Sequence, residues 1–122
     1  MPPLLVVDDE VAIAAMLQAL LEDEGYHVDT AGNGQAALAC VAARRPDIVV
    51  SDVMMPNLDG WQLCQALQTD PSFRSIPIVL MSAGRPPQLR DGCAYTAFVR
   101  KPFNLDTMLE TIAGIVAATS RP

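Results

Sequence analysis

The apolar residues of the chain fall into five short runs, separated by stretches in which apolar residues recur with a different spacing. The clearest run is 48–50, three branched aliphatic residues that lie between Pro46 and Pro56 and lead into Asp52. A β-branched run bounded by prolines predicts a strand, and its lack of alternation is typical of a parallel strand covered on both faces. Similar runs predict strands at 4–7, 26–31, 76–81 and 97–100.

The stretches between these runs carry apolar residues every three to four positions, as amphipathic helices do. The first helix is expected to begin at Val11 and to end at Gly25, which suits a helix C-terminus. Asn104 can cap the last helix, with Asp106 well placed in its first turn. Two further helices are predicted at 35–44 and 61–69. Strands alternating with helices imply an α/β protein with a doubly wound parallel sheet and right-handed crossovers.

The length and composition indicate one globular domain covering residues 1–122, without a linker or repeat. A hydrophobic content of 51% with 18% charged residues is typical of a compact protein rather than a disordered one. The net charge of −6 argues against direct contact with nucleic acid or with anionic membranes. No apolar run approaches the length of about 18 residues that a membrane span needs.

The start of the chain and its cysteines favour a cytoplasmic location. Met1 lies close to the first predicted strand, without the charged start and apolar segment of a signal peptide. Cys40, Cys64 and Cys93 are odd in number, widely spaced and without a CxxC arrangement, which argues against a disulfide framework or a zinc site. We therefore expect the cysteines to be small buried hydrophobic residues.

Four of the predicted strands end at polar functional groups, namely Asp8 and Asp9, Asp52, Ser82 and Lys101. The carboxyl ends of parallel strands share one edge, where open α/β sheets bind their ligands, so these groups should converge. Three carboxylates brought together repel one another unless a cation holds them, and oxygen ligands favour a hard ion such as Mg²⁺. Lys101 is the only lysine, and its compact ammonium suits a phosphate or carboxylate oxygen.

The chemistry that fits this edge is attack of an aspartate carboxylate on a phosphoryl group, which gives an acyl phosphate. The transfer needs little beyond alignment and neutralisation of the equatorial phosphoryl oxygens. Mg²⁺ on the side of Asp8 and Asp9, the Lys101 ammonium and the Ser82 hydroxyl could supply that neutralisation.

In order and spacing, these residues resemble the receiver domain of a two-component response regulator, similar to the stand-alone chemotaxis type. The resemblance covers nearly the whole chain and implies a flavodoxin-like fold with strand order 2-1-3-4-5 and helices on both faces. It rests on Asp8-Asp9 after an apolar strand, Asp52 with Met55-Pro56 and Asp59-Gly60, Ile76-Pro77 before Ser82-Ala83, and Lys101-Pro102-Phe103.

The resemblance implies that Asp52 accepts a phosphoryl group from a histidine kinase or a histidine phosphotransfer protein. Asp9, Asp52 and the backbone carbonyl of Met54 would ligate Mg²⁺, with Asp8 acting directly or through water. A receiver of this kind promotes its own phosphotransfer and slow dephosphorylation, and it is not a turnover enzyme.

The resemblance also implies a switch that alters the binding of a downstream protein target or an output domain. Ser82 would be the hydroxyl that turns toward the phosphoryl group, and Phe98 the aromatic residue whose rotamer follows. Lys101 would contact the phosphoryl group, and the bond from Lys101 to Pro102 would be cis, although only about 5% of X-Pro bonds are.

The chain departs from the family pattern between Ser82 and Lys101, where it is a few residues shorter than usual. Pro86-Pro87 falls where the fourth helix normally begins, so we expect that helix to be shortened or replaced by a loop. The family's usual signalling face includes this helix, so the resemblance does not extend to partner binding there. Met54 and Gly84 stand at two positions that tune the lifetime of the acyl phosphate in the family.

Three other classes of function use similar parts. A phosphatase resembling the haloacid dehalogenase group needs a second aspartate two residues after the nucleophile, where this chain has Met54. A flavodoxin-like cofactor binder needs a phosphate-cradling loop after the first strand, where this chain has Asp8-Asp9-Glu10. A receiver that only mediates interactions would not need the full set of acidic, hydroxyl and lysine groups.

Overall fold

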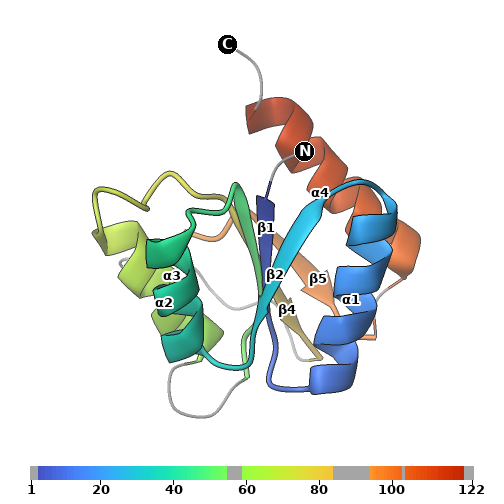
Figure 1. Cartoon of the computed structure of the whole chain (residues 1–122), viewed down its shortest axis with the longest axis horizontal. Coiled ribbons are helices and arrows are strands. Elements are labelled where there is room, and N and C mark those ends of the chain that lie inside the picture. Colours follow the sequence, from blue (N-terminus) through green and yellow to red (C-terminus); the bar gives the residue numbers. More distant parts are fainter. Residues whose placement is uncertain (1–2, 55–58, 84–93, 103, 120–122) are drawn as a thin grey trace.

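The structure is a computed structural model that describes residues 3–54, 59–83, 94–102 and 104–119. Within these residues, strands and helices follow one another in the predicted order (Figure 1). The strands are β1 (Pro3–Val7), β2 (His27–Ala31), β3 (Ile48–Asp52), β4 (Ile78–Ser82) and β5 (Ala97–Arg100), and the helices are α1 (Val11–Asp23), α2 (Gly34–Ala43), α3 (Gly60–Thr69) and α4 (Leu105–Thr119). The sheet has the order β2-β1-β3-β4-β5 with every neighbouring pair parallel, which confirms the doubly wound topology.

The sheet separates two hydrophobic cores. Helices α1 and α4 cover one face, and α2 and α3 cover the other (Figure 1). Because successive side chains of a strand point to opposite faces, Leu4 and Val6 of β1 enter the first core, whereas Leu5 and Val7 enter the second. Every residue of β3 and β4 is buried, as the unbroken apolar runs predicted.

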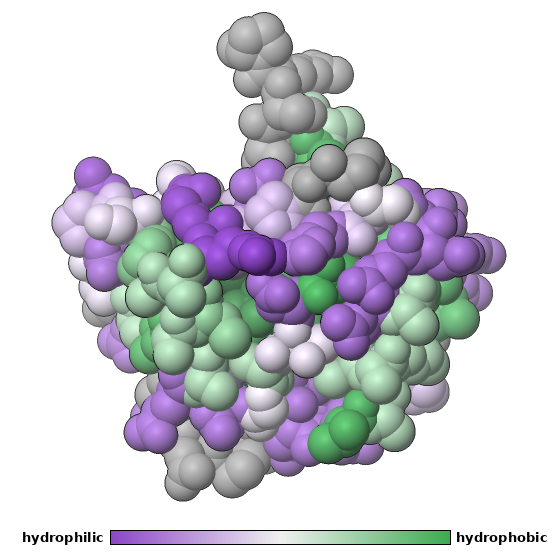
Figure 2. Space-filling view, viewed as in Figure 1, coloured by the Kyte–Doolittle hydropathy of each residue, from purple (hydrophilic) through white to green (hydrophobic). Residues whose placement is uncertain are grey.

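Strand β2 forms one edge of the sheet, and part of it is exposed to solvent. His27 and Thr30 are exposed, whereas Val28 and Ala31 are buried. Figure 2 shows hydrophilic and apolar side chains mixed over the surface formed by α1, β2 and α2. Polar side chains on an edge strand disfavour pairing with another chain.

The helix ends follow local capping rules, most of which were predicted. Gly25 has a φ of 98° directly after α1 and confirms the expected C-terminal stop. Asn104 caps α4, since its side-chain oxygen accepts a hydrogen bond of 2.8 Å from the backbone N–H of Asp106. Asn33 caps α2 by accepting a 2.8 Å bond from the N–H of Ala36, a cap that was not predicted.

Helix α3 begins directly against the last residue of β3. Asp59 and Gln62 form a capping box at its N-terminus. The N–H of Gly60 donates to the carbonyl of Val53 at 3.0 Å. A Cβ atom at Gly60 would lie 2.3 Å from the carbonyl oxygen of Asp52, so only glycine fits there. The start of α3 is therefore in close contact with the backbone of Asp52.

Helix α3 is also joined to the chain that leads into β5. The side-chain amide of Gln68 donates to the carbonyl of Ala94 at 2.6 Å and accepts from the N–H of the same residue. Near the other end of α3, the ring of Trp61 lies 6.5 Å from that of Tyr95, and Tyr95 lies 6.5 Å from Phe98 in β5. These contacts join α3 to the residues that lead into β5.

The cysteine expectation needs a correction. Cys64 is fully buried in α3, as expected, but it is disulfide-bonded. Cys40 is free and half-buried. Spacing along the chain gives no distance in the fold, so the sequence argument against a disulfide was wrong.

Two other sequence-based expectations fall outside the described residues. They are the shortened fourth helix at Pro86-Pro87 and the role of Gly84 in the lifetime of the acyl phosphate. Among the described residues, no helix is both long enough and apolar enough to cross a bilayer.

Candidate functional site

The polar groups at the ends of the central strands meet at one edge of the sheet, as predicted. Asp8 follows β1, and its N–H donates to the carbonyl of Ala31 at the end of β2 at 3.1 Å. Asp52 and Ser82 close β3 and β4, and the N–H of Lys101 after β5 donates to the carbonyl of Ser82 at 2.9 Å. Asp8, Asp52 and Ser82 are 1%, 5% and 9% exposed, so these polar groups are nearly removed from water.

The ammonium of Lys101 lies between two carboxylates. Its Nζ donates to Oδ2 of Asp8 at 3.0 Å and to Oδ2 of Asp52 at 3.1 Å. The Lys101 side chain is only 14% exposed, so solvent screens these ion pairs weakly. The peptide bond from Lys101 to Pro102 is cis, as the resemblance implied.

One ammonium shared by two carboxylates affects the partners differently. Burial raises the pKa of Asp52, and the nearby charge of Asp8 adds to this, while the bond and charge of Lys101 work in the opposite direction without cancelling it. Burial alone would lower the pKa of Lys101, but its bonds to both carboxylates outweigh burial and raise that pKa. The lysine is therefore held protonated. The negative charge of ionised Asp52, by contrast, is not fully offset by the charge and the hydrogen bond of Lys101.

Replacing Asp52 with asparagine is expected to stabilise the protein when no divalent cation is present. Because the pKa of Asp52 is higher in the folded state than its ordinary value of 3.8, the wild type loses stability as the pH rises from 3.8 through the folded pKa. Asparagine cannot ionise, so Asp52→Asn should raise the free energy of unfolding at neutral pH by about 1 kcal/mol. Urea unfolding in EDTA would measure it. The gain should vanish below pH 3.8, and an equal gain at all pH values would contradict the explanation.

The same edge carries a group of oxygen donors. Among the described residues, carboxylate oxygens of Asp8, Glu10 and Asp52 lie within 4.8 Å of one another. Oxygen-only ligands of negative charge suit a hard cation such as Mg²⁺, so the residues fit the metal that the sequence predicted. Glu10 was not among the predicted ligands, because an acidic residue just before a helix is favoured there whether or not it binds an ion.

The other two predicted metal ligands are Asp9 and the backbone carbonyl of Met54. Asp9 is exposed, and its carboxylate does not belong to this group. The N–H of Met54 donates to Oδ1 of Asp52 at 3.3 Å, while the Met54 side chain is 73% exposed. The roles of Asp9 and of the Met54 carbonyl as metal ligands therefore stay predictions.

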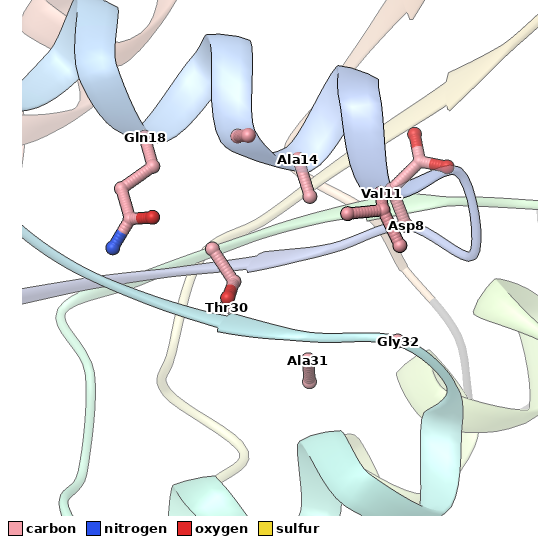
Figure 3. A pocket seen from close by; sticks show the side chains of 8 residues that line it. Asp8, Val11, Ala14, Gln18, Thr30, Ala31 and Gly32 are labelled. Atoms are coloured by element: carbon pink, nitrogen blue, oxygen red, sulfur yellow. The ribbon is translucent and has the colours of Figure 1, made fainter.

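A hollow of about 230 Å³ opens beside Asp8, between α1 and the end of β2 (Figure 3). Its lining is made largely of small side chains, including Ala14 and Gly32. In Figure 3 the Asp8 carboxylate points toward the loop that leads into α1, away from Gln18 and Thr30. The hollow thus lies beside the acidic edge, although Asp8 itself is almost entirely buried.

The predicted switch residues lie on neighbouring strands. Ser82 is the last residue of β4, and Phe98 is half-buried in β5, where it is paired in register with Leu80. Phe98 packs against the core under α2 and α3. Their arrangement is compatible with a hydroxyl–aromatic switch, and the roles themselves stay predictions.

Comparison with known proteins supports the same interpretation. A family model described as the response regulator receiver domain matches residues 4–113. Response regulator Rre1 of Synechocystis is 38% identical over 120 residues, which are 93% of this chain and 51% of Rre1. Response regulator PleD of Caulobacter vibrioides is 49% identical over 80 residues, which are 66% of this chain and 18% of PleD. The chain thus spans about half, or less, of the length of these relatives.

Solved structures agree in fold. Chemotaxis protein CheY4 of Vibrio cholerae superimposes with a TM-score of 0.87 at 32% identity, covering 94% of this chain and 98% of that one. The signal receiver domain of a signal transduction histidine kinase from Syntrophus aciditrophicus gives a TM-score of 0.90 at 28% identity, covering 100% of this chain and 95% of that one. The carboxylates and lysine at the sheet edge, the family model and these structures together show that the chain belongs to the response regulator receiver domains of two-component signalling.

Proposed function

We propose that Asp52 accepts a phosphoryl group in a Mg²⁺-dependent reaction and that the modified protein binds a partner differently. The observation that carries the proposal is the pairing of one largely buried lysine with both Asp8 and Asp52 at the edge of the sheet. This arrangement provides a carboxylate nucleophile, a fixed positive charge and two further carboxylates for a cation.

The chain's own groups position and neutralise the reacting atoms. A carboxylate oxygen of Asp52 attacks phosphorus and forms a bond to it. The bond from phosphorus to the donor's nitrogen or oxygen breaks in the same transfer. Lys101 already donates to Asp52 and would redirect its ammonium to a phosphoryl oxygen. A bound Mg²⁺ would supply further charge neutralisation, held by Asp8 and Asp52. The Ser82 hydroxyl would donate to another phosphoryl oxygen.

The proposed partners follow from the family. The phosphoryl donor would be a phosphohistidine on a histidine kinase or a phosphotransfer protein. The partner whose binding changes would be a downstream protein or an output domain. We propose that the chain promotes its own phosphotransfer without being a turnover enzyme. We also propose a cytoplasmic location for the protein.

The test is intact-mass measurement after incubation with acetyl phosphate, with and without Mg²⁺. The expected result is a gain of one phosphoryl group that requires Mg²⁺, is released by alkali and is absent in Asp52→Asn. Asp47→Asn is the matched control, because Asp47 is an exposed aspartate directly before the opposite end of the same strand. It should be phosphorylated like the wild type.

A rapidly hydrolysed adduct could escape detection, so beryllofluoride, a stable mimic of the phosphoryl group, is the second probe. Mg²⁺-dependent binding of beryllofluoride to the wild type, and not to Asp52→Asn, would still support the proposal. An adduct that persists in Asp52→Asn, or the absence of both the adduct and beryllofluoride binding, would refute it.

A further inference from the structure

Glu10 precedes α1 but does not cap it. Glu10 is the N-cap residue, where a side chain usually accepts a hydrogen bond from the first N–H groups of the helix, and its carboxylate accepts none. In the described part of the chain, this carboxylate also has no ion-pair partner. The exposed side chain is therefore available to a ligand from solvent.

The backbone of Glu10 is fixed next to Asp8. The N–H of Glu10 donates to Oδ1 of Asp8 at 2.9 Å, while Oδ2 of Asp8 accepts from Lys101. This bond keeps the Glu10 side chain beside the acidic edge, where its carboxylate lies within 4.8 Å of oxygens from Asp8 and Asp52. Such a separation is comparable to twice the distance of about 2.0–2.6 Å between a hard cation and its oxygen ligands.

The charges at this edge do not balance without a further cation. Asp8, Glu10 and Asp52 bring three negative charges when ionised, and Lys101 brings one positive charge. The ion pairs of Lys101 go to Asp8 and Asp52, and it forms none with Glu10 within the described residues. One divalent cation would cancel the remaining two negative charges.

We propose that Glu10 is a third carboxylate of the Mg²⁺ site, acting with Asp8 and Asp52. The inference rests on the proposed function for the presence of the cation, and it adds a residue that the family resemblance did not supply. Glutamate suits this position because its extra methylene lets a side chain on the loop after β1 reach the edge of the sheet. The neighbouring Asp9, whose carboxylate lies outside the group, is the natural comparison.

The experiment is calorimetric titration of the phosphate-free protein with MgCl₂. Glu10→Gln keeps the size of the side chain and removes its charge, and we expect it to raise the Kd for Mg²⁺ about tenfold. The increase in Tm on addition of Mg²⁺ is an independent readout, because a cation that binds only the folded state stabilises it by mass action. This increase should be smaller in Glu10→Gln than in the wild type at the same Mg²⁺ concentration.

Two further variants separate direct contact from a long-range charge effect. Glu22→Gln removes the same charge from an exposed glutamate near the other end of α1 and should leave the Kd unchanged. Glu10→Asp keeps the charge but shortens the side chain, so it should weaken Mg²⁺ binding as Glu10→Gln does. A wild-type Kd in Glu10→Gln, or in Glu10→Asp, would overturn the proposal.

The outcomes also distinguish this inference from the proposed function. If the wild type binds Mg²⁺ and the Glu10 variants bind equally well while Asp9→Asn does not, Asp9 rather than Glu10 is the ligand and the proposed function is unaffected. If the wild type does not bind Mg²⁺ at all, both the inference and the Mg²⁺ dependence of the proposed function are wrong.

Discussion

Replacing Lys101 with methionine is expected to lower the free energy of unfolding by about 3 kcal/mol in the absence of divalent cations. The substitution keeps a long side chain but removes the ammonium that pairs with Asp8 and Asp52. Two nearly buried carboxylates would then face each other without a positive charge. Urea unfolding at neutral pH in EDTA would measure the loss.

Mg²⁺ and pH provide two checks on the cause of this loss. Mg²⁺ should stabilise Lys101→Met more than the wild type, because the cation replaces the missing positive charge and no longer competes with the ammonium. Lowering the pH should also reduce the loss, since protonation of Asp52, whose pKa burial already raises, removes the repulsion. Arg100→Met is the control, an exposed neighbour with the same change in charge. An equal loss in Arg100→Met would show that the ion pairs with Asp8 and Asp52 are not responsible.

Replacing Gly60 with alanine is expected to destabilise the fold by about 3 kcal/mol. The added methyl group would lie 2.3 Å from the carbonyl oxygen of Asp52 and 3.0 Å from the Cα of Val53, both of which are backbone atoms that cannot rotate away. The start of α3 would have to shift, and the bond from the Gly60 N–H to Val53 would weaken. Chemical denaturation followed by circular dichroism would measure the change.

Gly114→Ala is the matched control for this substitution. Gly114 lies inside α4, and a Cβ atom there would meet nothing within 4 Å. Alanine should therefore raise the free energy of unfolding by about 0.5–1 kcal/mol, since glycine is unfavourable within a helix. If Gly60→Ala is as stable as the wild type, the close packing of α3 against Asp52 is not a constraint on the fold.

The strands and the groups at their ends could be predicted because both are local properties of the sequence. The run 48–50 is apolar throughout since β3 is covered on both faces, and parallel strands necessarily bring Asp52 and Lys101 to one edge. Gly25 and Asn104 were likewise recognised by rules that involve only their neighbours.

Some details were not predicted because the same sequence signal fits two local structures. One was not predicted because it depends on contacts between residues far apart in the chain. An acidic residue just before a helix fits the helix dipole whether or not it faces a ligand, so Glu10 gave no distinct signal. Asn33 between two glycines suits a turn as well as an N-cap. The disulfide of Cys64 depends on proximity in space, which the separation of cysteines along the chain does not reveal.

The contact between Trp61 and Tyr95 has a spectroscopic consequence. Trp61 is the only tryptophan in the chain, so its emission comes from a single place, the junction of α3 with the residues that lead into β5. Tyr95 also touches Phe98, so a rotation of Phe98 that displaces Tyr95 would alter the surroundings of the indole. The protein therefore contains an intrinsic fluorophore at this junction, and a change confined to α1 would leave its emission unaltered.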